Sequence, residues 1–274
     1  MKTNRFNSQK LLVIMIACAI IPLLITACQP TAPSIDVVEE TPVSPTVQVS
    51  ESTEPIEEPL SINFELSDLA QGKTVETVAA VQPNKESPYW EIMPEHLLVT
   101  LEDYPVSSHL MKPQIFVYPV AELSEFNAST AQMVLDLQTL LNDQQVKESM
   151  PFLPLFNAAQ VMHSQLAFVD FKNGNGVRFL TQFDQAPIPL NNMELIYTFQ
   201  GLTDDGKYYI AAIFPINHPD LPNDNQVSSD QEFEAEKFVA EMAESVEKLG
   251  QLPVSSFTPD LSKLDTLIQS IEVK

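Results

Sequence analysis

The chain has 274 residues, with 37 acidic and 14 basic side chains, and its formal net charge is −23 at pH 7. Nucleic-acid binding and docking of a basic patch on anionic lipid headgroups both depend on cationic side chains, so this charge balance argues against both. With only 6 glycines, the chain also has few of the glycine-rich loops that cradle phosphates or dinucleotides.

The first 27 residues have the pattern of an export signal. Lys2, Arg5 and Lys10 form a basic start without any acid, and an uncharged, mostly apolar run follows from Leu11 to Thr26. A membrane-spanning helix needs about 20 apolar residues, and Pro22 interrupts this shorter run. We therefore expect residues 1–27 to be a cleavable signal peptide.

The signal ends in the residues Ile25-Thr26-Ala27-Cys28. This motif resembles the lipobox of bacterial lipoproteins, a branched apolar residue and two small residues before a cysteine. The resemblance implies that a diacylglyceryl group is attached to the Cys28 thiol, that the signal is cut before it, and that the new amino terminus is acylated. The protein would then be held by this lipid on the extracytoplasmic face of the cell membrane. Gln29 is not the aspartate associated with inner-membrane retention, so inner and outer membrane both stay open.

An ordinary signal peptide or a signal anchor, in which Cys28 has no role, is the alternative interpretation of the same residues. The other cysteine, Cys18, lies inside the signal. After cleavage the protein would have one thiol, which excludes an internal disulfide and cysteine-based metal sites.

Residues 29–60 change composition abruptly. They contain six prolines, seven acids and many Ser, Thr and Val, but no Lys, Arg, Gly or aromatic residue. Such a segment buries too little apolar surface to offset its ordering entropy, so we expect residues 28–60 to be a lipidated cysteine followed by a disordered stalk. Fully extended, the stalk would span at most roughly 100 Å. A single globular domain is expected over residues 61–274.

Period-two alternation marks the start of this domain. Apolar residues alternate over 62–66 and 97–101, which predicts half-buried strands. Residues 115–118 form a further short strand that Pro119 stops. Ser129 is the expected N-cap of a helix that runs to about Leu141.

Two hairpins follow this helix. Strands over 166–171 and 177–183 flank Asn173-Gly174-Asn175-Gly176, where we expect the positive φ angles of a tight turn. A strand starting at Met193 leads to the turn Asp204-Asp205-Gly206. The returning strand, 208–214, is apolar on both faces, which places it in the centre of the sheet beneath helices.

Two helices end the chain. Ser229 and Glu232 form a capping-box pair before a helix that ends at Gly250. Thr258 is the expected cap of the last helix, which has Pro259 in its first turn. The apolar positions of the two helices recur at spacings of three and four: Ala235, Val239, Met242, Val246 and Leu249 in the first, and Leu261, Leu264, Ile268 and Ile271 in the second.

The order of these elements predicts an α+β domain with a mainly antiparallel sheet built from hairpins and about three packed helices. Two hairpins followed by a Leu/Ile helix over 261–271 resemble the C-terminal part of domains with the PsbP and Mog1 type of fold. No functional residue is implied by that resemblance.

The candidate site residues each have a structural alternative. His96, His109, His163 and His218 lack the spacing of a helical zinc site, which favours structural roles. Asp220, Asp224 and Asp230 lie on or after a loop rich in oxygen ligands and form a candidate calcium site, although such residues are also common in ordinary loops and first helical turns. Adjacent Asp204 and Asp205 are expected to point apart into water. Tyr89, Trp90 and Tyr104 form either an exposed binding surface or an edge of the core.

The sequence contains no nucleophile elbow and no dinucleotide fingerprint. No cofactor is predicted. We expect a non-catalytic domain that binds a protein, a cell-envelope component or a small solute, or that assists envelope assembly. The alternative is an extracytoplasmic hydrolase whose carboxylates or histidines converge from separate loops.

Overall fold

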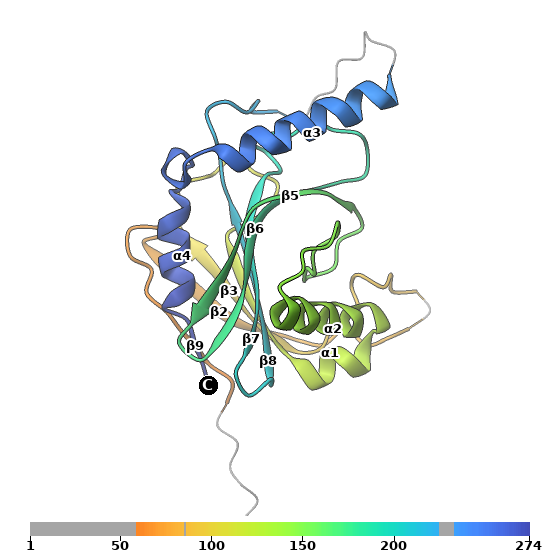
Figure 1. Cartoon of the computed structure of the whole chain (residues 1–274). Coiled ribbons are helices and arrows are strands. Elements are labelled where there is room, and N and C mark those ends of the chain that lie inside the picture. The colour runs from red at the N-terminus through yellow and green to blue at the C-terminus, as the bar shows by residue number, and fades with distance from the viewer. Residues whose placement is uncertain (1–58, 85, 225–232) are drawn as a thin grey trace, which may run out of the picture. The chain divides into compact units, whose positions relative to one another are not determined.

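A seven-stranded antiparallel sheet runs through the middle of the domain (Figure 1). The computed structural model describes residues 59–84, 86–224 and 233–274, all of which belong to one compact unit, Pro55–Lys274. The strands lie in the order β2-β3-β4-β8-β7-β6-β5. Their bounds are β2 (Gly72–Val78), β3 (His96–Glu102), β4 (Gln114–Pro119), β5 (Ala159–Phe171), β6 (Gly174–Asp184), β7 (Ile196–Thr203) and β8 (Tyr208–Pro215).

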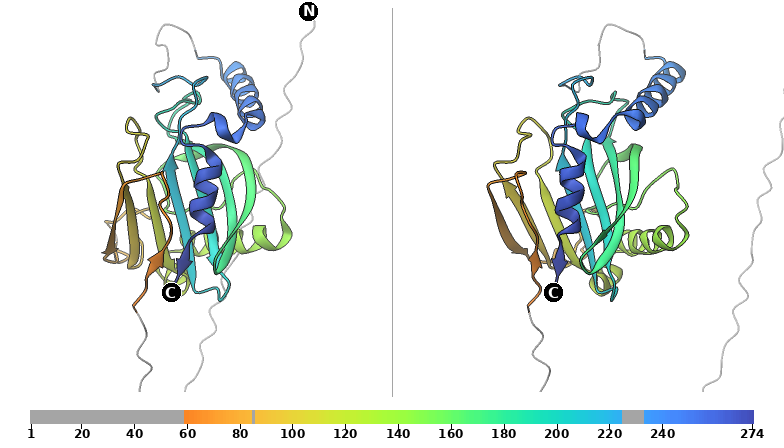
Figure 2. Two further views of the ribbon diagram at one scale, coloured as in Figure 1. Left: turned by 90° about the vertical axis from the view of Figure 1, so that its left-hand side faces the viewer. Right: turned by 60° about the vertical axis from the view of Figure 1, so that its left-hand side comes forward.

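Helices cover both faces of this sheet (Figures 1 and 2). On one face lie α1 (Val120–Phe126) and α2 (Ala128–Asp143), and on the other lies α4 (Leu261–Gln269). The long helix α3 (Ala235–Gln251) contacts β5 at the sheet edge. A 3-10 turn, Val254–Ser256, joins α3 to α4.

Successive residues of one strand serve two separate cores. In β4, Ile115 and Val117 pack with α4, whereas Phe116 and Tyr118 pack with α1 and α2. Side chains of a strand point alternately to the two faces, so a strand covered on both faces is apolar at nearly every position. The same reason explains β8, whose position in the middle of the sheet confirms the prediction for residues 208–214.

The predicted α+β class with a mainly antiparallel sheet is confirmed. The described residues contain four α-helices rather than three, because α1 forms directly after the strand that ends at Pro119. The predicted strand over 62–66 is reduced to β1 (Ile62–Asn63), which pairs with β9 (Glu272–Val273) in a separate two-stranded sheet. Strand β2 has no counterpart among the predicted elements.

The first predicted hairpin is confirmed, but its turn is Lys172-Asn173, and the positive φ angles expected at Asn173–Gly176 are wrong. Gly174 and Gly176 belong to β6, and among the described glycines only Gly206 has a positive φ, of 70°. Gly176 is needed for space instead: an added Cβ would lie 2.4 Å from the Phe199 ring and 2.5 Å from the Gln200 carbonyl oxygen. Close packing against the neighbouring strand therefore accounts for this glycine.

Two predicted helix caps are also wrong. The side chain of Asn127, not of Ser129, caps α2 by accepting a hydrogen bond from the Ser129 backbone N–H at 2.9 Å. The side chain of Asp260, not of Thr258, caps α4 in the same way. In both cases the cap lies two residues away from the predicted residue, and its oxygen satisfies a free N–H of the first turn. Ser229 and Glu232 lie outside the described residues.

Candidate functional site

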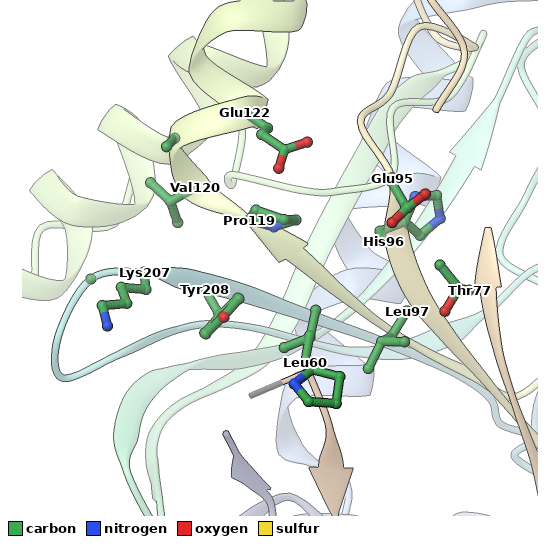
Figure 3. Close-up of a pocket in the computed structure, with 13 residues that line it drawn as sticks. Leu60, Thr77, Glu95, His96, Leu97, Pro119, Val120, Glu122, Lys207 and Tyr208 are labelled. Atoms are coloured by element: carbon green, nitrogen blue, oxygen red, sulfur yellow. The ribbon is translucent and has the colours of Figure 1, made fainter. Parts of the chain in front are cut away.

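A cleft of about 800 Å³ opens at the end of the sheet that carries the β7–β8 turn (Figure 3). We call it the Glu95–Glu122 cleft. Five parts of the chain meet there: residues 59–60, the end of β2, the start of β3, the junction of β4 with α1, and the β7–β8 turn. The lining residues are Pro59, Leu60, Thr77, Glu95, His96, Leu97, Pro119, Val120, Ala121, Glu122, Gly206, Lys207 and Tyr208.

His96 is the buried polar group of the cleft wall. Its ring lies 4.6 Å from the Tyr118 ring, and only 8% of the residue is exposed. The Nδ1 atom lies 2.8 Å from the Pro94 carbonyl oxygen. Because a carbonyl oxygen only accepts, Nδ1 carries the hydrogen and Nε2 is an acceptor. Burial lowers the pKa of His96, so the ring is neutral at pH 7.

Two carboxylates stand at the rim of the cleft. Glu95 directly precedes β3, and Glu122 lies in the first turn of α1; both side chains are exposed. Figure 3 shows them on the same side of the opening, whereas Lys207 lies at the other end. Lys207 follows Gly206 in the β7–β8 turn, and its ammonium is 3.7 Å from the Asp205 carboxylate.

The body of the cleft is apolar. Its lining includes Leu60, Leu97, Pro119, Val120 and Tyr208. An apolar wall with a few polar groups is typical of small-molecule sites. Glu95, Glu122 and the neutral ring of His96 supply hydrogen-bond acceptors among the lining residues. Lys207 is the one cationic side chain among the described lining residues, and its charge is already partly balanced by Asp205. Such a cleft favours a ligand with an apolar body and a hydrogen-bond-donating cationic end.

The other three histidines have structural hydrogen bonds. His109 Nε2 donates to the Leu195 carbonyl oxygen at 2.9 Å while its Nδ1 accepts from the Met111 N–H, and burial lowers its pKa. His163 Nε2 lies 3.1 Å from the Lys147 carbonyl oxygen. His218 Nδ1 accepts from the Asp220 N–H at 3.2 Å. The four histidines do not converge on one site, as their sequence spacing indicated.

The loop proposed for calcium is held by Asn192. Its amide donates to the carbonyl oxygens of His218 and Leu221, each at 3.0 Å, and accepts from the His218 N–H at 2.8 Å. Asp220 and Asp224 are exposed at this loop, and Asp230 lies outside the described residues. Within the described ranges, no group of three or more His, Cys, Asp or Glu side chains is arranged to hold a metal ion. The calcium prediction itself stays a prediction.

The three aromatic residues do not form one surface. Tyr104 is 9% exposed, stacks on Phe214 and donates to the Pro215 carbonyl oxygen at 3.0 Å, so it belongs to the core. Tyr89 is 50% exposed and meets Trp90 edge to face at 5.1 Å. This second pair lies on the loop before β3, away from the lining of the Glu95–Glu122 cleft.

A second group of carboxyls lies at the loop that joins β6 to β7. Asp184 is 5% exposed, and its Oδ2 accepts from the Gln182 amide at 2.8 Å. Asn191 donates to the Glu194 Oε2 at 2.7 Å. Burial, followed by the charge of Glu194, raises the pKa of Asp184 to about 6.

No spacing in the sequence links the residues of either group. Glu95, His96, Glu122 and Lys207 come from three distant parts of the chain. Asp184 and Glu194 are closer together but belong to a loop without a recognisable motif. The hairpin tip was predicted correctly as a turn, although the Thr203 hydroxyl lowers the pKa of Asp205.

The predicted lipobox residues Ile25, Thr26, Ala27 and Cys28 lie outside the described part of the chain, as does nearly all of the predicted stalk. Among the described helices, none is both long and apolar enough to span a membrane. Comparisons with protein-family models, with curated proteins and with solved structures found no match.

Proposed function

We propose that this chain is a lipid-anchored extracytoplasmic binding protein that takes a small cationic, partly apolar ligand into the Glu95–Glu122 cleft. The location rests on the signal pattern and on the resemblance of residues 25–28 to a lipobox. The ligand class rests on one observation: two carboxylates, those of Glu95 and Glu122, line a largely apolar cleft of about 800 Å³ together with the neutral His96.

A ligand ammonium group would lie between the carboxylates, where charge-assisted hydrogen bonds are stronger than neutral ones. Its apolar part would cover Leu97, Val120 and Tyr208. Phosphate-bearing ligands are disfavoured because Lys207 is the one cationic side chain among the described residues that line the cleft. The resemblance of the C-terminal elements to the PsbP and Mog1 type of fold adds no ligand to this proposal.

The binding proposal is tested with hexylammonium and hexanoate, two ligands of equal chain length and opposite charge. The full chain, reconstituted in phosphatidylcholine nanodiscs, is expected to bind hexylammonium more tightly than hexanoate in calorimetric titrations. Glu122→Gln should weaken hexylammonium binding about fivefold or more, because it removes one charge-assisted contact. Glu125→Gln, on the same helix but outside the cleft lining, is the matched control. Equal affinity for the two ligands, or an equal effect of both substitutions, would contradict the ligand class.

The anchor is tested separately from the ligand. Mass spectrometry of the protein isolated from its own membranes is expected to show an acylated Cys28 as the first residue. Cys28→Ala should abolish this modification. An unmodified residue 28, or a retained signal, would refute the anchor without affecting the cleft.

A hydrolase remains the second candidate because two carboxyls, Asp184 and Glu194, are brought together as that hypothesis requires. Asp184 is buried and bonded to Gln182, however, so the pair does not face the Glu95–Glu122 cleft. Carboxylates that act on a glycosidic bond flank it within one cleft. Hydrolysis of a chromogenic glycoside or ester that both Asp184→Asn and Glu194→Gln abolish would favour the enzyme over the binding protein.

A further inference from the structure

Two neighbouring carboxyl groups lie at the end of β6, away from the Glu95–Glu122 cleft. Asp184 is the last residue of β6, and Glu194 lies just before β7. Gly174, at the other end of β6, pairs with Thr203 beside the β7–β8 turn, so the carboxyls lie at the opposite end of the sheet. Asp184 is 5% exposed, whereas Glu194 is partly exposed. One carboxylate of the pair is therefore accessible from solvent.

Two buried amide side chains hold the carboxyls in place. Gln182 donates to Asp184 Oδ2 at 2.8 Å, and Asn191 donates to Glu194 Oε2 at 2.7 Å. The amides are also joined to each other, because the Asn191 backbone N–H donates to Gln182 Oε1 at 3.1 Å. Both side chains donate to the Pro189 carbonyl oxygen, at 3.2 and 3.0 Å. Hydrogen bonds thus fix both carboxyls to one loop, as a binding site requires.

The second oxygen of Asp184 points to a partner outside the chain. Its Oδ1 atom is buried and receives no hydrogen bond from the described residues. Buried polar atoms are nearly always satisfied, so such an oxygen indicates a bound water, proton or ion. The neighbouring group whose charge acts on Asp184 is Glu194, not a lysine or arginine. A water would leave both charges in place, and a shared proton would neutralise one of them. A divalent cation would neutralise both.

The available ligand atoms favour a hard cation. Carboxylate oxygens suit Ca²⁺ and Mg²⁺, whereas Zn²⁺ is bound mainly by nitrogen and sulfur. His109 is near Glu194, but its two ring nitrogens are already hydrogen-bonded to the backbone of Leu195 and Met111. In the part of the chain that the structure describes, no third acidic, histidine or cysteine side chain joins the pair. Two carboxylates with water in the remaining positions are typical of Mg²⁺ and of weak Ca²⁺ sites.

We propose that Asp184 and Glu194 bind a divalent cation, Ca²⁺ or Mg²⁺, between their carboxylates. Asp184 Oδ1 and the Glu194 carboxylate are the protein ligands, and water completes the coordination shell. The cation enters from the side of Glu194, which solvent reaches. Once bound, it ties the end of β6 to the residue before β7 and so orders the loop 185–193 between them. This role does not depend on what occupies the Glu95–Glu122 cleft.

Calcium chloride and magnesium chloride are the probes. The full chain in phosphatidylcholine nanodiscs is freed of metal with a chelator and titrated calorimetrically with each salt, in about 0.1 M KCl to screen the acidic surface. We expect one site with a Kd of about 0.1–1 mM for at least one of the two ions. Amide hydrogen exchange in residues 185–193 should slow at least about threefold at saturation, because the cation closes the loop.

Substitution of each ligand tests the site. Asp184→Asn should weaken cation binding at least about tenfold and abolish the slower exchange, since it removes one of two carboxylates. The asparagine oxygen still accepts from Gln182, so the fold is retained. Glu194→Gln, at the partly exposed position, should have the same effect and provides the test if Asp184→Asn does not fold.

Asp170→Asn is the matched control, because Asp170 is an exposed aspartate of β5. It should leave the Kd within about twofold of the parent. An equal loss with Asp170→Asn would assign the binding to the acidic surface in general and overturn the proposal. Absence of binding by both ions would also overturn it, and would leave a shared proton or a water as the partner of Asp184.

Discussion

Gly176 and Gly206 are the same residue type with different functions in the fold. Gly206 has a φ of 70°, and nothing would lie within 4 Å of an added Cβ. Gly176 lies in β6, where the Phe199 ring and the Gln200 carbonyl oxygen occupy the place of a Cβ. Backbone conformation therefore selects the first glycine, and packing space selects the second.

Substituting each glycine by alanine separates these causes. Gly176→Ala should lower the free energy of unfolding by about 2 kcal/mol or more, because a carbonyl of the neighbouring strand has to move. Gly206→Ala should lower it by about 1 kcal/mol, the cost of a left-handed conformation with a Cβ. Gly206→Asn should cost less than Gly206→Ala, since asparagine tolerates that conformation. Urea unfolding measures all three values, and equal losses for the two alanine variants would show that space at Gly176 is not limiting.

Asp184 gives the domain a pH dependence of unusual sign. Its pKa is about 6 in the folded protein against 3.8 for an unperturbed carboxyl. Between these values the folded state holds a proton that the unfolded state has released, so the free energy of unfolding falls as the pH rises. The stabilisation that comes from the proton on Asp184 is fully present below about pH 3.8. It is lost as the pH rises to about 6 and above.

Asp184→Asn mimics the protonated carboxyl. The asparagine oxygen still accepts from Gln182, and its amide can donate to Glu194. From pH 4 to pH 7 the variant should lose less stability than the parent, by roughly 2 kcal/mol. Urea unfolding at a series of pH values provides the comparison, with Asp170→Asn on the exposed face of β5 as the control. Parallel curves for Asp184→Asn and the parent would show that Asp184 does not hold the proton.

At the scale of elements, a strand or helix is predictable from the sequence when its buried positions leave a regular pattern of apolar residues. The β8 segment is apolar at nearly every position because it is covered on both faces, which made its central place predictable. Strand β2, at the sheet edge, is mostly exposed and has no alternation to mark it. The short helix α1 follows a strand without a recognisable capping residue. Both were therefore missed.

The candidate sites were less predictable than the strands. His96 is visible in the sequence as a histidine, but no local pattern places it in one cleft with Glu122 and Lys207. The sheet order β3-β4-β8 brings these residues together, because the start of β3, the end of β4 and the start of β8 lie at one end of three neighbouring strands. Such proximity depends on strand pairing between segments that are far apart in sequence, which no local pattern records.

Helix α4 is fixed to the sheet by a buried polar contact in addition to its apolar side. The Asp265 Oδ1 accepts from the Tyr197 hydroxyl at 2.8 Å and lies 3.2 Å from Arg178 Nε. Arg178, the only arginine in the described residues, is 6% exposed and also donates to the Gln165 carbonyl oxygen. A buried guanidinium needs its carboxylate because its charge is otherwise uncompensated.

Removing the carboxylate should therefore cost much more than removing the hydroxyl. Asp265→Ala is expected to lower the free energy of unfolding by about 3 kcal/mol, and Tyr197→Phe by about 1 kcal/mol. Lys263→Ala, which breaks the exposed ion pair of α4 with Asp68, should leave stability near the parental value. Thermal and urea unfolding measure the three effects. A loss for Lys263→Ala as large as that for Asp265→Ala would mean that burial does not set the strength of these contacts.

For the whole molecule, the excess of acidic side chains is the dominant electrostatic property. With a net charge of −23, like charges crowd together on folding and lower the stability of the compact state. The described ion pairs offset little of this repulsion, because nearly all of them are exposed: Lys147 with Asp136, Lys207 with Asp205, Lys237 with Glu241, Lys248 with Glu244, Lys263 with Asp68 and Lys274 with Glu272.

Added salt should therefore stabilise the protein. The Debye length falls from more than 20 Å at about 0.02 M salt to less than 10 Å at about 0.3 M, so repulsion between acids on different elements is screened. Tm is expected to rise by a few degrees, about 2–5 °C, over this range in differential scanning calorimetry at pH 7. Potassium chloride at the same ionic strength should have the same effect as sodium chloride, because screening depends on ionic strength and not on the cation. A Tm that falls with salt would show that attractive pairs, rather than the excess of acids, dominate the electrostatic free energy of this fold.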